Sequence, residues 1–347
     1  MAASAFSCAI RPYRPEDREN LKALCAETWP DLSPEAFERR WWWRSPSPPL
    51  KIAADEKTGE ITGFCAYIPF AADDGRRVRS SAWLVDFFVS PRRQGQGIGR
   101  RLVESVNREF EIVASLNQSD AAYALFSRLG WAERRRIKLH LNFWPLLPGA
   151  VRLLAAGETD ANFQLRGAPF PSGHLGLEFD RLWDDARGRF GLSSVRSSRS
   201  LLERFGWPGN PYRLLRCERK GTLAGYMITR RLAGGAVRSL RGLPAGLIVD
   251  YLTAQEGAAQ IFSALLAESA RQLAGEGPAV ILALSSVPAF GRELAKLGFV
   301  HSESQLIGKA LSRLDVGFTI TAASGGEAIA AAPWFLTLGD CDMDLMW

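Results

Sequence analysis

The chain of 347 residues is poor in cysteine and histidine, and it has no long apolar run. Its five cysteines are far apart, odd in number and without a C-x-x-C pair, which argues against a disulfide framework or a zinc site. No stretch reaches the roughly 18 apolar residues of a membrane span, and residues 1–11 lack a signal-peptide core. We therefore expect a cytoplasmic protein with reduced, buried thiols, no membrane span and no metal.

A dense basic run with interleaved aromatic residues is also missing. The formal charge of +6 comes mainly from arginines spread along the chain, which makes nucleic acid the weakest candidate partner. A moderately basic surface suits a small anionic ligand equally well. A composition of 47% hydrophobic and 23% charged residues is that of a globular protein. The length predicts two domains of about 150 to 175 residues each.

A strand, a glycine-rich loop and a helix are predicted between residues 85 and 110. The apolar run Val85–Val89 predicts a buried strand, and residues at helical spacing from Leu102 to Phe110 predict a helix. The loop between them contains Gly95, Gly97 and Gly99. Such a loop presents backbone N–H groups and the positive end of the helix dipole, which together favour a pyrophosphate.

The spacing of these glycines excludes two common phosphate-binding motifs. Neither the G-x-G-x-x-G dinucleotide fingerprint nor a P-loop with Lys-Ser or Lys-Thr is present. What is present is Gln94-x-x-Gly97-x-Gly99 after a strand that ends in Val-Ser-Pro. This pattern resembles motif A of the GNAT superfamily of acyl-CoA-dependent N-acyltransferases, in which it grips the CoA pyrophosphate.

The resemblance covers the first 143 residues. It includes the opening Ile10–Asp17 and the segment Phe126–Trp131, which corresponds to the family's Tyr-x-x-x-Gly-Phe. The element order also agrees, with strands expected at 8–12, 50–54, 61–70, 85–89, 112–114 and 137–143, and helices at 15–29, 33–43 and 120–129. Three adjacent tryptophans follow in the second helix. They either pack in a lid against the core or form a wall of the acceptor site: Trp41, Trp42 and Trp43.

The resemblance implies a set of residues that contact acetyl-CoA, or another acyl-CoA, as co-substrate. The strand end around Phe88, Val89 and Ser90 would pair with the pantetheine and polarise the thioester carbonyl. The pyrophosphate would be held by Arg93, Gln94, Gly95, Gln96, Gly97, Ile98, Gly99 and Arg100. Two positions depart from the family pattern, because Phe126 replaces the usual tyrosine and Ser119 the usual asparagine, with Asn117 close by.

The acylation of an amine needs a base for the ammonium and an acid for the thiolate. Asp86 is the one carboxylate on the strand before the glycine loop, and we expect it to be the base or the amine anchor. The alternative is that Asp86 caps a loop or pairs with an arginine, a structural role that a corresponding aspartate, Asp250, in the second half favours. Tyr123 lies one helical turn before Phe126 and is the candidate acid, unless it is a core aromatic and water serves instead.

The second half of the chain repeats features of the first. Gly225 corresponds to Gly63, Asp250 to Asp86 and Gly298 to Gly130, in the same order. We expect a GNAT domain at 1–145, a linker at 146–175 and a degenerate GNAT-like domain at 176–347 that does not bind CoA. Its counterpart loop carries one glycine and the carboxylate of Glu256. The spaced acidic residues Asp340, Asp342 and Asp344 are expected in a solvated acidic tail or on the polar face of a strand rather than around a metal.

The sequence thus predicts an α/β (α+β) protein with two GNAT-like domains, each a mixed, mostly antiparallel twisted sheet flanked by helices. The expected activity is transfer of an acetyl group from acetyl-CoA to an amine, with a small molecule or an amino sugar favoured over a protein amine. Transfer of a longer acyl chain from CoA or acyl carrier protein, and a non-catalytic CoA-binding or scaffold role, remain alternatives. Both a monomer with pseudo-dimeric tandem domains and a homodimer are compatible with the repeat.

Overall fold

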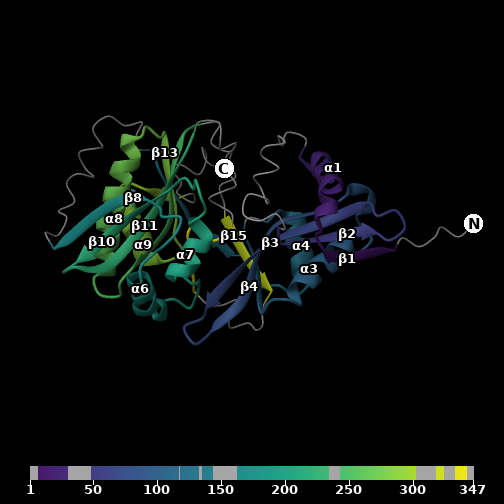
Figure 1. The fold of residues 1–347 in the computed structure, drawn as a ribbon, viewed down its shortest axis with the longest axis horizontal. Coiled ribbons are helices and arrows are strands. Elements are labelled where there is room, and N and C mark those ends of the chain that lie inside the picture. The colour runs from purple at the N-terminus through teal and green to yellow at the C-terminus, as the bar shows by residue number, and fades with distance from the viewer. Residues whose placement is uncertain are drawn as a thin grey trace, which may run out of the picture. The chain divides into compact units, whose positions relative to one another are not determined.

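Two compact units make up the chain (Figure 1). The computed structural model describes residues 7–29, 48–116, 118–132, 135–143, 162–233, 243–301, 318–323 and 333–341. The first unit comprises Met1–Ala71, Arg79–Arg135 and Thr319–Ala330, and the second comprises Ala72–Val78, Arg136–Phe318 and Ala331–Trp347. The expected helix at 33–43, with its three tryptophans, lies outside the described residues.

The first unit contains a sheet with strand order β1-β2-β3-β4-β5-β15-β6. Its strands are β1 (Cys8–Pro12), β2 (Leu50–Asp55), β3 (Ile61–Asp73), β4 (Val78–Val89), β5 (Ile112–Leu116), β6 (Arg135–Ile137) and β15 (Phe318–Ala323). Its helices are α1 (Arg18–Thr28), α3 (Ile98–Asn107) and α4 (Asp120–Arg128), with 3-10 turns η1 (Pro15–Asp17) and η2 (Pro91–Arg93). Within the described residues, the strands and helices predicted up to residue 129 are present.

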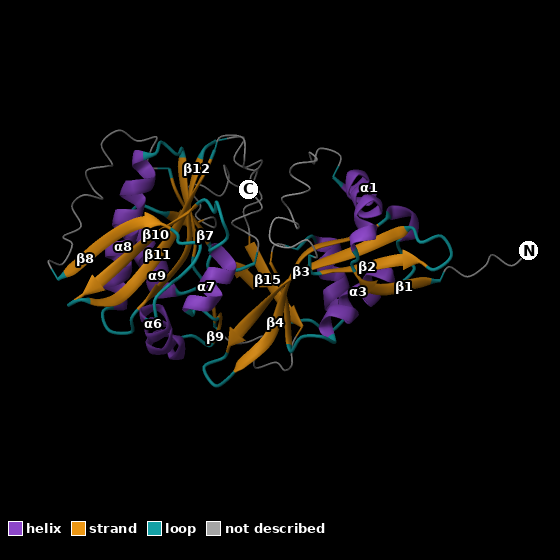
Figure 2. Ribbon diagram, in the orientation of Figure 1, coloured by secondary structure: helices purple, strands orange, loops and turns teal. Residues whose placement is uncertain are grey.

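The second unit contains a sheet with strand order β14-β7-β13-β12-β11-β10-β8. These strands are β7 (Leu139–Asn142), β8 (Phe163–Pro169), β10 (Tyr212–Arg219), β11 (Thr222–Leu232), β12 (Ala245–Thr253), β13 (Val280–Leu284) and β14 (Val300–His301). Short strands β9 (Leu192–Ser194) and β16 (Trp334–Phe335) pair with each other. The helices are α6 (Glu178–Ala186), α7 (Ser198–Phe205), α8 (Ala258–Gly275) and α9 (Pro288–Lys296), with η4 at Arg187–Arg189. Figure 2 shows both sheets with their flanking helices.

Each of the two sheets contains one strand that comes from the other half of the sequence. In the first unit β15 pairs antiparallel with β5, with Ile320 opposite Leu116. In the second unit β7 pairs antiparallel with β13, with Leu282 opposite Leu141. The prediction that 137–143 completes the first sheet is therefore wrong for β7, although β6 does belong to that sheet. An apolar strand fits either sheet, and local sequence does not choose between them.

Strand β8 lies where a linker is expected. It pairs antiparallel with β10 over its whole length, with Gly167 opposite Leu215. Its glycine and terminal proline led to the linker interpretation, but both residue types are tolerated in an edge strand. The residues at 163–169 are thus part of the second sheet.

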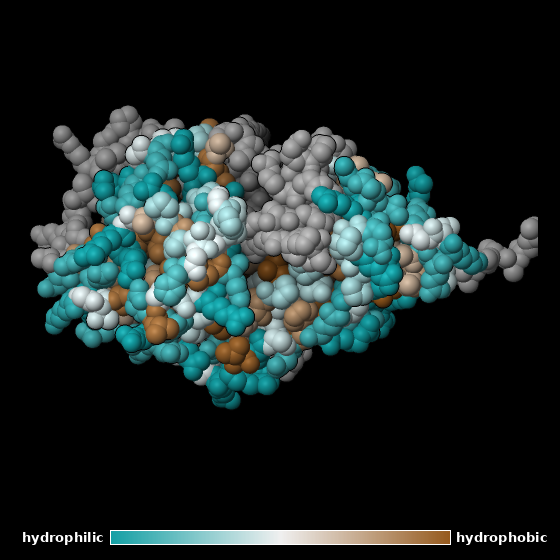
Figure 3. Space-filling view, in the orientation of Figure 1, coloured by the Kyte–Doolittle hydropathy of each residue, from teal (hydrophilic) through white to brown (hydrophobic). Residues whose placement is uncertain are grey.

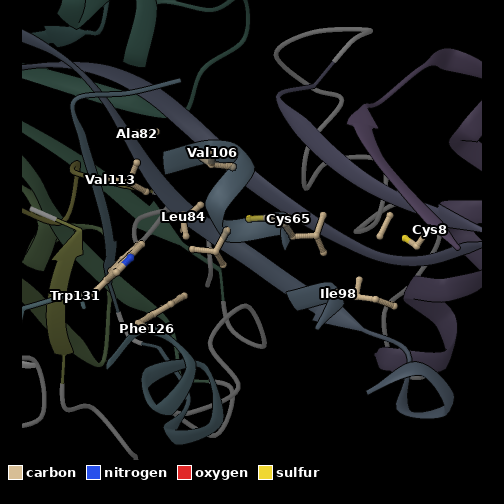
Figure 4. Packing of buried hydrophobic residues seen from close by; sticks show 12 residues of the cluster. Cys8, Cys65, Ala82, Leu84, Ile98, Val106, Val113, Phe126 and Trp131 are labelled. Atoms are coloured by element: carbon tan, nitrogen blue, oxygen red, sulfur yellow. The ribbon is translucent and has the colours of Figure 1, made fainter. Parts of the chain in front are cut away.

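Two apolar layers cover the faces of the first sheet. On one face α3 contributes Ile98, Leu102, Val103 and Val106 to a core that also contains Cys65, Leu84, Phe126 and Trp131 (Figure 4). On the other face α1 contributes Leu21, Leu24 and Cys25, which pack with Ile52 and Phe64. The sheet thereby fixes the start of α3 relative to the end of β4.

A buried ion network holds the second unit together. Arg196, which is 3% exposed, donates from Nε to Asp250 at 3.0 Å and from Nη2 to Asp340 at 2.8 Å. Asp250 also accepts from the Tyr226 hydroxyl at 2.8 Å and from Thr337 Oγ1 at 2.8 Å. The expectation of a solvated acidic segment is therefore wrong for Asp340, while the other two acidic residues of that segment lie outside the described part of the chain.

The described surface in Figure 3 is mostly hydrophilic, with small, separate apolar patches. Val78, Leu177 and Leu243 are the large apolar side chains that are exposed among the described residues. All five cysteines are buried. Among the helices that the structure describes, none has the length and apolarity needed to cross a membrane.

Candidate active site

The candidate site is built where β4 ends and α3 begins. The Ser90 N–H donates to the Thr62 carbonyl at 2.9 Å, and η2 then turns the chain. Gly95 and Gly97 have φ values of 78° and 76°, and a Cβ at either position would meet nothing within 4 Å. Left-handed backbone favours glycine, so both residues are needed for this turn. We call residues 90–97 the glycine loop.

The start of α3 has unpaired backbone N–H groups. Gly97 is the N-cap residue and supplies no side chain, and the first turn contains no acidic residue. The first intrahelical bond runs from the Arg101 N–H to the Gly97 carbonyl at 3.1 Å. The N–H groups of Ile98, Gly99 and Arg100 precede that bond, so they are among the N–H groups that a helix leaves without an internal acceptor. The arrangement suits an anion.

Side chains around the loop fix its shape and set its charge. The Gln94 side chain donates from Nε2 to the Val89 carbonyl at 3.1 Å and so holds the loop against the strand end. Arg93 lies 3.6 Å from the Asp55 carboxylate. Arg100 forms an exposed pair with Glu104 at 2.7 Å. Because exposed pairs contribute little, the Arg100 guanidinium can exchange Glu104 for a phosphate at low cost. Arg101 points elsewhere and donates to the Cys8 carbonyl at 2.6 Å.

The third glycine of the motif has a packing role. A Cβ on Gly99 would lie 2.9 Å from Cζ of Phe87, so only glycine lets α3 approach β4 this closely. A Cβ on Gly63 would likewise lie 2.9 Å from the Phe88 carbonyl oxygen. The predicted residues Phe88 and Val89 are half-buried and Ser90 is buried, all at the end of β4.

The alternation of side chains along β4 is interrupted at Asp86. Leu84 and Phe87 both pack in the core on the α3 side, although an uninterrupted strand would place them on opposite faces. In the second unit, the register of β11 and β12 shifts at the corresponding place, where Ile228 pairs with Asp250 and Thr229 with Ile248. Such irregularities redirect a side chain. Asp86 itself is 6% exposed, and its charge together with burial raises the pKa of the Cys65 thiol, with burial the larger cause.

Helix α4 places the remaining predicted residues. Ser119 is its N-cap residue and accepts from the Ala122 N–H at 3.2 Å. Tyr123 is half-buried in the first turns of the helix. Phe126 is 1% exposed and stacks on Trp131 with ring centroids 4.3 Å apart. Figure 4 shows the two rings side by side in the core.

The structure therefore brings the glycine loop, the end of β4 and the start of α3 together, as the motif predicts. It places Phe126 in the core, where it has no exposed surface for a cofactor to touch. Two features are not apparent from the motif: the Gln94 contact with the strand and the side-chain shift at Asp86. Within the described residues, no group of His, Cys, Asp and Glu side chains is arranged to hold a metal ion.

Comparison with known proteins agrees with this geometry. The model of the acetyltransferase (GNAT) family matches residues 15–131, so this segment belongs to that family. The protein is accordingly an acyltransferase enzyme of the GNAT type. A comparison with curated proteins found no match.

Solved structures share the fold of the chain. A GCN5-related N-acetyltransferase from Anabaena variabilis has a TM-score of 0.57 at 12% identity, over 90% of this chain and 72% of the other. N-myristoyltransferase of Saccharomyces cerevisiae with myristoyl-CoA has a TM-score of 0.53 at 13% identity, over 93% and 82%. A fungal glucosamine N-acetyltransferase region has a TM-score of 0.56 at 14% identity, over 92% of this chain and 38% of the other. At these identities the likeness concerns the fold.

Proposed function

We propose that the first unit transfers an acetyl group from acetyl-CoA to the nitrogen of a small amine. The observation that carries this proposal is the uncapped start of α3 behind two left-handed, unobstructed glycines, Gly95 and Gly97. Backbone N–H groups at this place suit a pyrophosphate, and Arg93 and Arg100 lie beside it.

In the proposed reaction, the amine nitrogen attacks the thioester carbonyl carbon and the carbon–sulfur bond breaks. Asp86 takes the proton that the ammonium must lose, because it is the carboxylate on the strand that leads to the glycine loop. Backbone N–H groups around Val89 polarise the carbonyl oxygen. Tyr123 donates a proton to the leaving thiolate, since Phe126 has no hydroxyl to do so.

The two corresponding aspartates differ in one neighbouring residue of the adjacent strand. In the second unit Tyr226 donates its hydroxyl to Asp250, whereas the residue at the corresponding position of β3 is Phe64. A phenylalanine offers no such donor. Asp86 therefore does not share that fixed structural bond.

The test is the unfolding temperature with and without acetyl-CoA, for the wild type and for Gly97→Glu. At a ligand concentration of about 100 Kd, a ligand that binds only the folded state stabilises it by about 2.7 kcal/mol. We expect the wild type to show this stabilisation and Gly97→Glu to lose it, because the new carboxylate repels the pyrophosphate. Gly209→Glu is the matched control, since Gly209 has a φ of 74° and nothing within 4 Å of a Cβ.

The donor is tested in the same assay. Stabilisation by myristoyl-CoA but not by acetyl-CoA would replace acetyl with a longer acyl group, and absence of both would contradict the proposal. A panel of amines, beginning with glucosamine because one structural neighbour is described as a glucosamine N-acetyltransferase, is then screened for release of free CoA. We also propose that the protein acts in the cytoplasm.

A further inference from the structure

The two sheets share details of register that the sequence repeat predicts. The parallel ladder of β4 and β5 runs from Ser81 opposite Ile112 to Leu84 opposite Ser115. The ladder of β12 and β13 runs from Ala245 opposite Val280 to Ile248 opposite Ala283, which are the corresponding residues of the repeat. The bond from Ser90 N–H to the Thr62 carbonyl also has a counterpart, from Ala254 N–H to the Ala224 carbonyl at 2.7 Å. The second unit can therefore be compared with the first residue by residue.

The counterpart of the glycine loop is short and already bonded. It runs from Ala254 to Gly257, a left-handed glycine at the start of α8. The Gln255 N–H donates to Oδ2 of Asp185 at 2.8 Å. Glu256 lies 3.4 Å from Arg219. A carboxylate of the chain thus accepts from the loop that precedes Gly257, while the first turn of α8, like that of α3, contains no acidic residue.

The end of the β12–β13 ladder is filled by the segment 334–340. Beyond Ile248, the next carbonyl of β12, that of Val249, accepts from the Gly339 N–H at 2.6 Å rather than from β13. On the other side, Ser286 accepts from the Leu336 N–H at 2.8 Å and donates to the Trp334 carbonyl. The segment therefore lies between β12 and the chain that follows β13.

This segment is packed and anchored. Phe335 stacks on Phe190 with centroids 4.2 Å apart, and Thr337 donates to Asp250. A Cβ on Gly339 would lie 2.9 Å from Cζ of Phe205 and 3.1 Å from the Val249 carbonyl oxygen. The segment therefore has no room for a side chain at position 339. Asp340 completes the anchor through its ion pair with Arg196.

We propose that the second unit is a degenerate GNAT-like domain that carries an internal substitute for acyl-CoA. Residues 334–340 lie beside β12 at the counterparts of Val85 and Asp86, next to the strand end where the thioester arm would lie beside β4. The whole chain accordingly binds one acyl-CoA. This inference relies on the proposed function for the comparison with the first unit.

The first test is a calorimetric titration of the full-length protein with acetyl-CoA. We expect one equivalent bound by the wild type and by Gly209→Glu, and none by Gly97→Glu. A second equivalent in the wild type would overturn the inference, because it requires an open site in the second unit.

The second test is amide hydrogen exchange of Leu336, Thr337 and Gly339 without ligand and with saturating acetyl-CoA. We expect these amides to exchange as slowly as those of β12 and to be unchanged by acetyl-CoA. Exchange much faster than in β12, or loss of protection when acetyl-CoA is added, would show that the segment leaves its place and would overturn the inference. If the wild type binds no acetyl-CoA, the proposed function fails, while exchange without ligand still decides this inference.

Discussion

Asp86 and Asp250 occupy corresponding positions in two similar sheets, and their surroundings differ. Asp250 is held by Arg196, Tyr226 and Thr337 in the interior of the second unit. In the first unit the tyrosine position is Phe64. The same backbone irregularity thus presents a carboxylate that is paired with Arg196 in one unit and that we propose as the base in the other. On this proposal, the two sheets preserve the position of a carboxylate but not its chemical role.

The largest effect is expected from breaking the buried network of the second unit. Arg196→Met leaves Asp250 and Asp340 buried without their cation, which costs about 3 to 5 kcal/mol of unfolding free energy. Urea denaturation measures this loss. Arg199→Met is the control, since Arg199 is 87% exposed in its pair with Glu203 and its loss should leave the stability nearly unchanged. Similar losses in both variants would contradict the assigned role of Arg196.

The same substitution, aspartate to asparagine, should lower the activity at Asp86 and the stability at Asp250. We expect Asp86→Asn to lower kcat/KM by about 10²- to 10³-fold and to keep the stabilisation by acetyl-CoA, because it removes a base but not the pyrophosphate site. Asp250→Asn should lower stability and leave kcat/KM of the folded enzyme nearly unchanged. Steady-state kinetics with the amine found by screening, beside thermal unfolding, measures both. An unchanged rate in Asp86→Asn would refute its role as base.

Strand β7 carries His140, which should make the free energy of unfolding depend on pH. Burial, followed by the nearby charges of His301 and Lys138, lowers the pKa of His140 to about 4. Between pH 6.5 and 4 the unfolded chain binds a proton that the folded chain does not, so stability falls as the pH falls, by up to about 3 kcal/mol. His140→Gln should remove this part of the pH dependence. Urea midpoints at pH 7.5, 6 and 5 measure it, and equal slopes in both proteins would contradict the assignment.

A smaller effect is expected for the proposed acid. Tyr123→Phe should lower kcat by about tenfold, less than the usual range for general acids, because a thiolate is a tolerable leaving group. The acetyl-CoA dissociation constant should stay the same. If kcat is unchanged over the pH range, Tyr123 is a packing residue and water supplies the proton.

The smallest effects concern the two N-cap glycines. Gly97→Ala and Gly257→Ala each place a side chain at φ values of 76° and 74°, at a cost of about 1 kcal/mol. We expect both to lower the unfolding temperature by a similar amount, and only Gly97→Ala to weaken the binding of acetyl-CoA. Weaker binding in Gly257→Ala would argue that the second unit takes part in it.

The local elements of the first unit were predictable because their signals are local. The glycine spacing, the apolar strand before it and the helical pattern after it lie within one short stretch, and each agrees with the others. The same holds for α4, which ends before Gly130 at a φ of 76°, as the glycine after Leu129 predicts.

What sequence reasoning missed depends on partners far along the chain. Arg196 looks like any surface arginine, because its two carboxylates are 54 and 144 residues away. The strands β7 and β15 carry apolar patterns that suit either sheet, so the local sequence does not predict which sheet each one joins. The motif predicts Phe126 at the cofactor, whereas its burial and its stacking on Trp131 place it in the core.

The pairing of β7 with β13 and of β15 with β5 also affects how the chain folds during its synthesis. The sheet of the first unit takes β15 between β5 and β6, so it stays incomplete until residue 323 has left the ribosome. Contacts this distant in sequence slow folding and leave strand edges exposed during synthesis. A fragment cut near residue 145 would lack one strand and carry another without its sheet. Neither sheet is therefore complete in a fragment that ends or begins near residue 145.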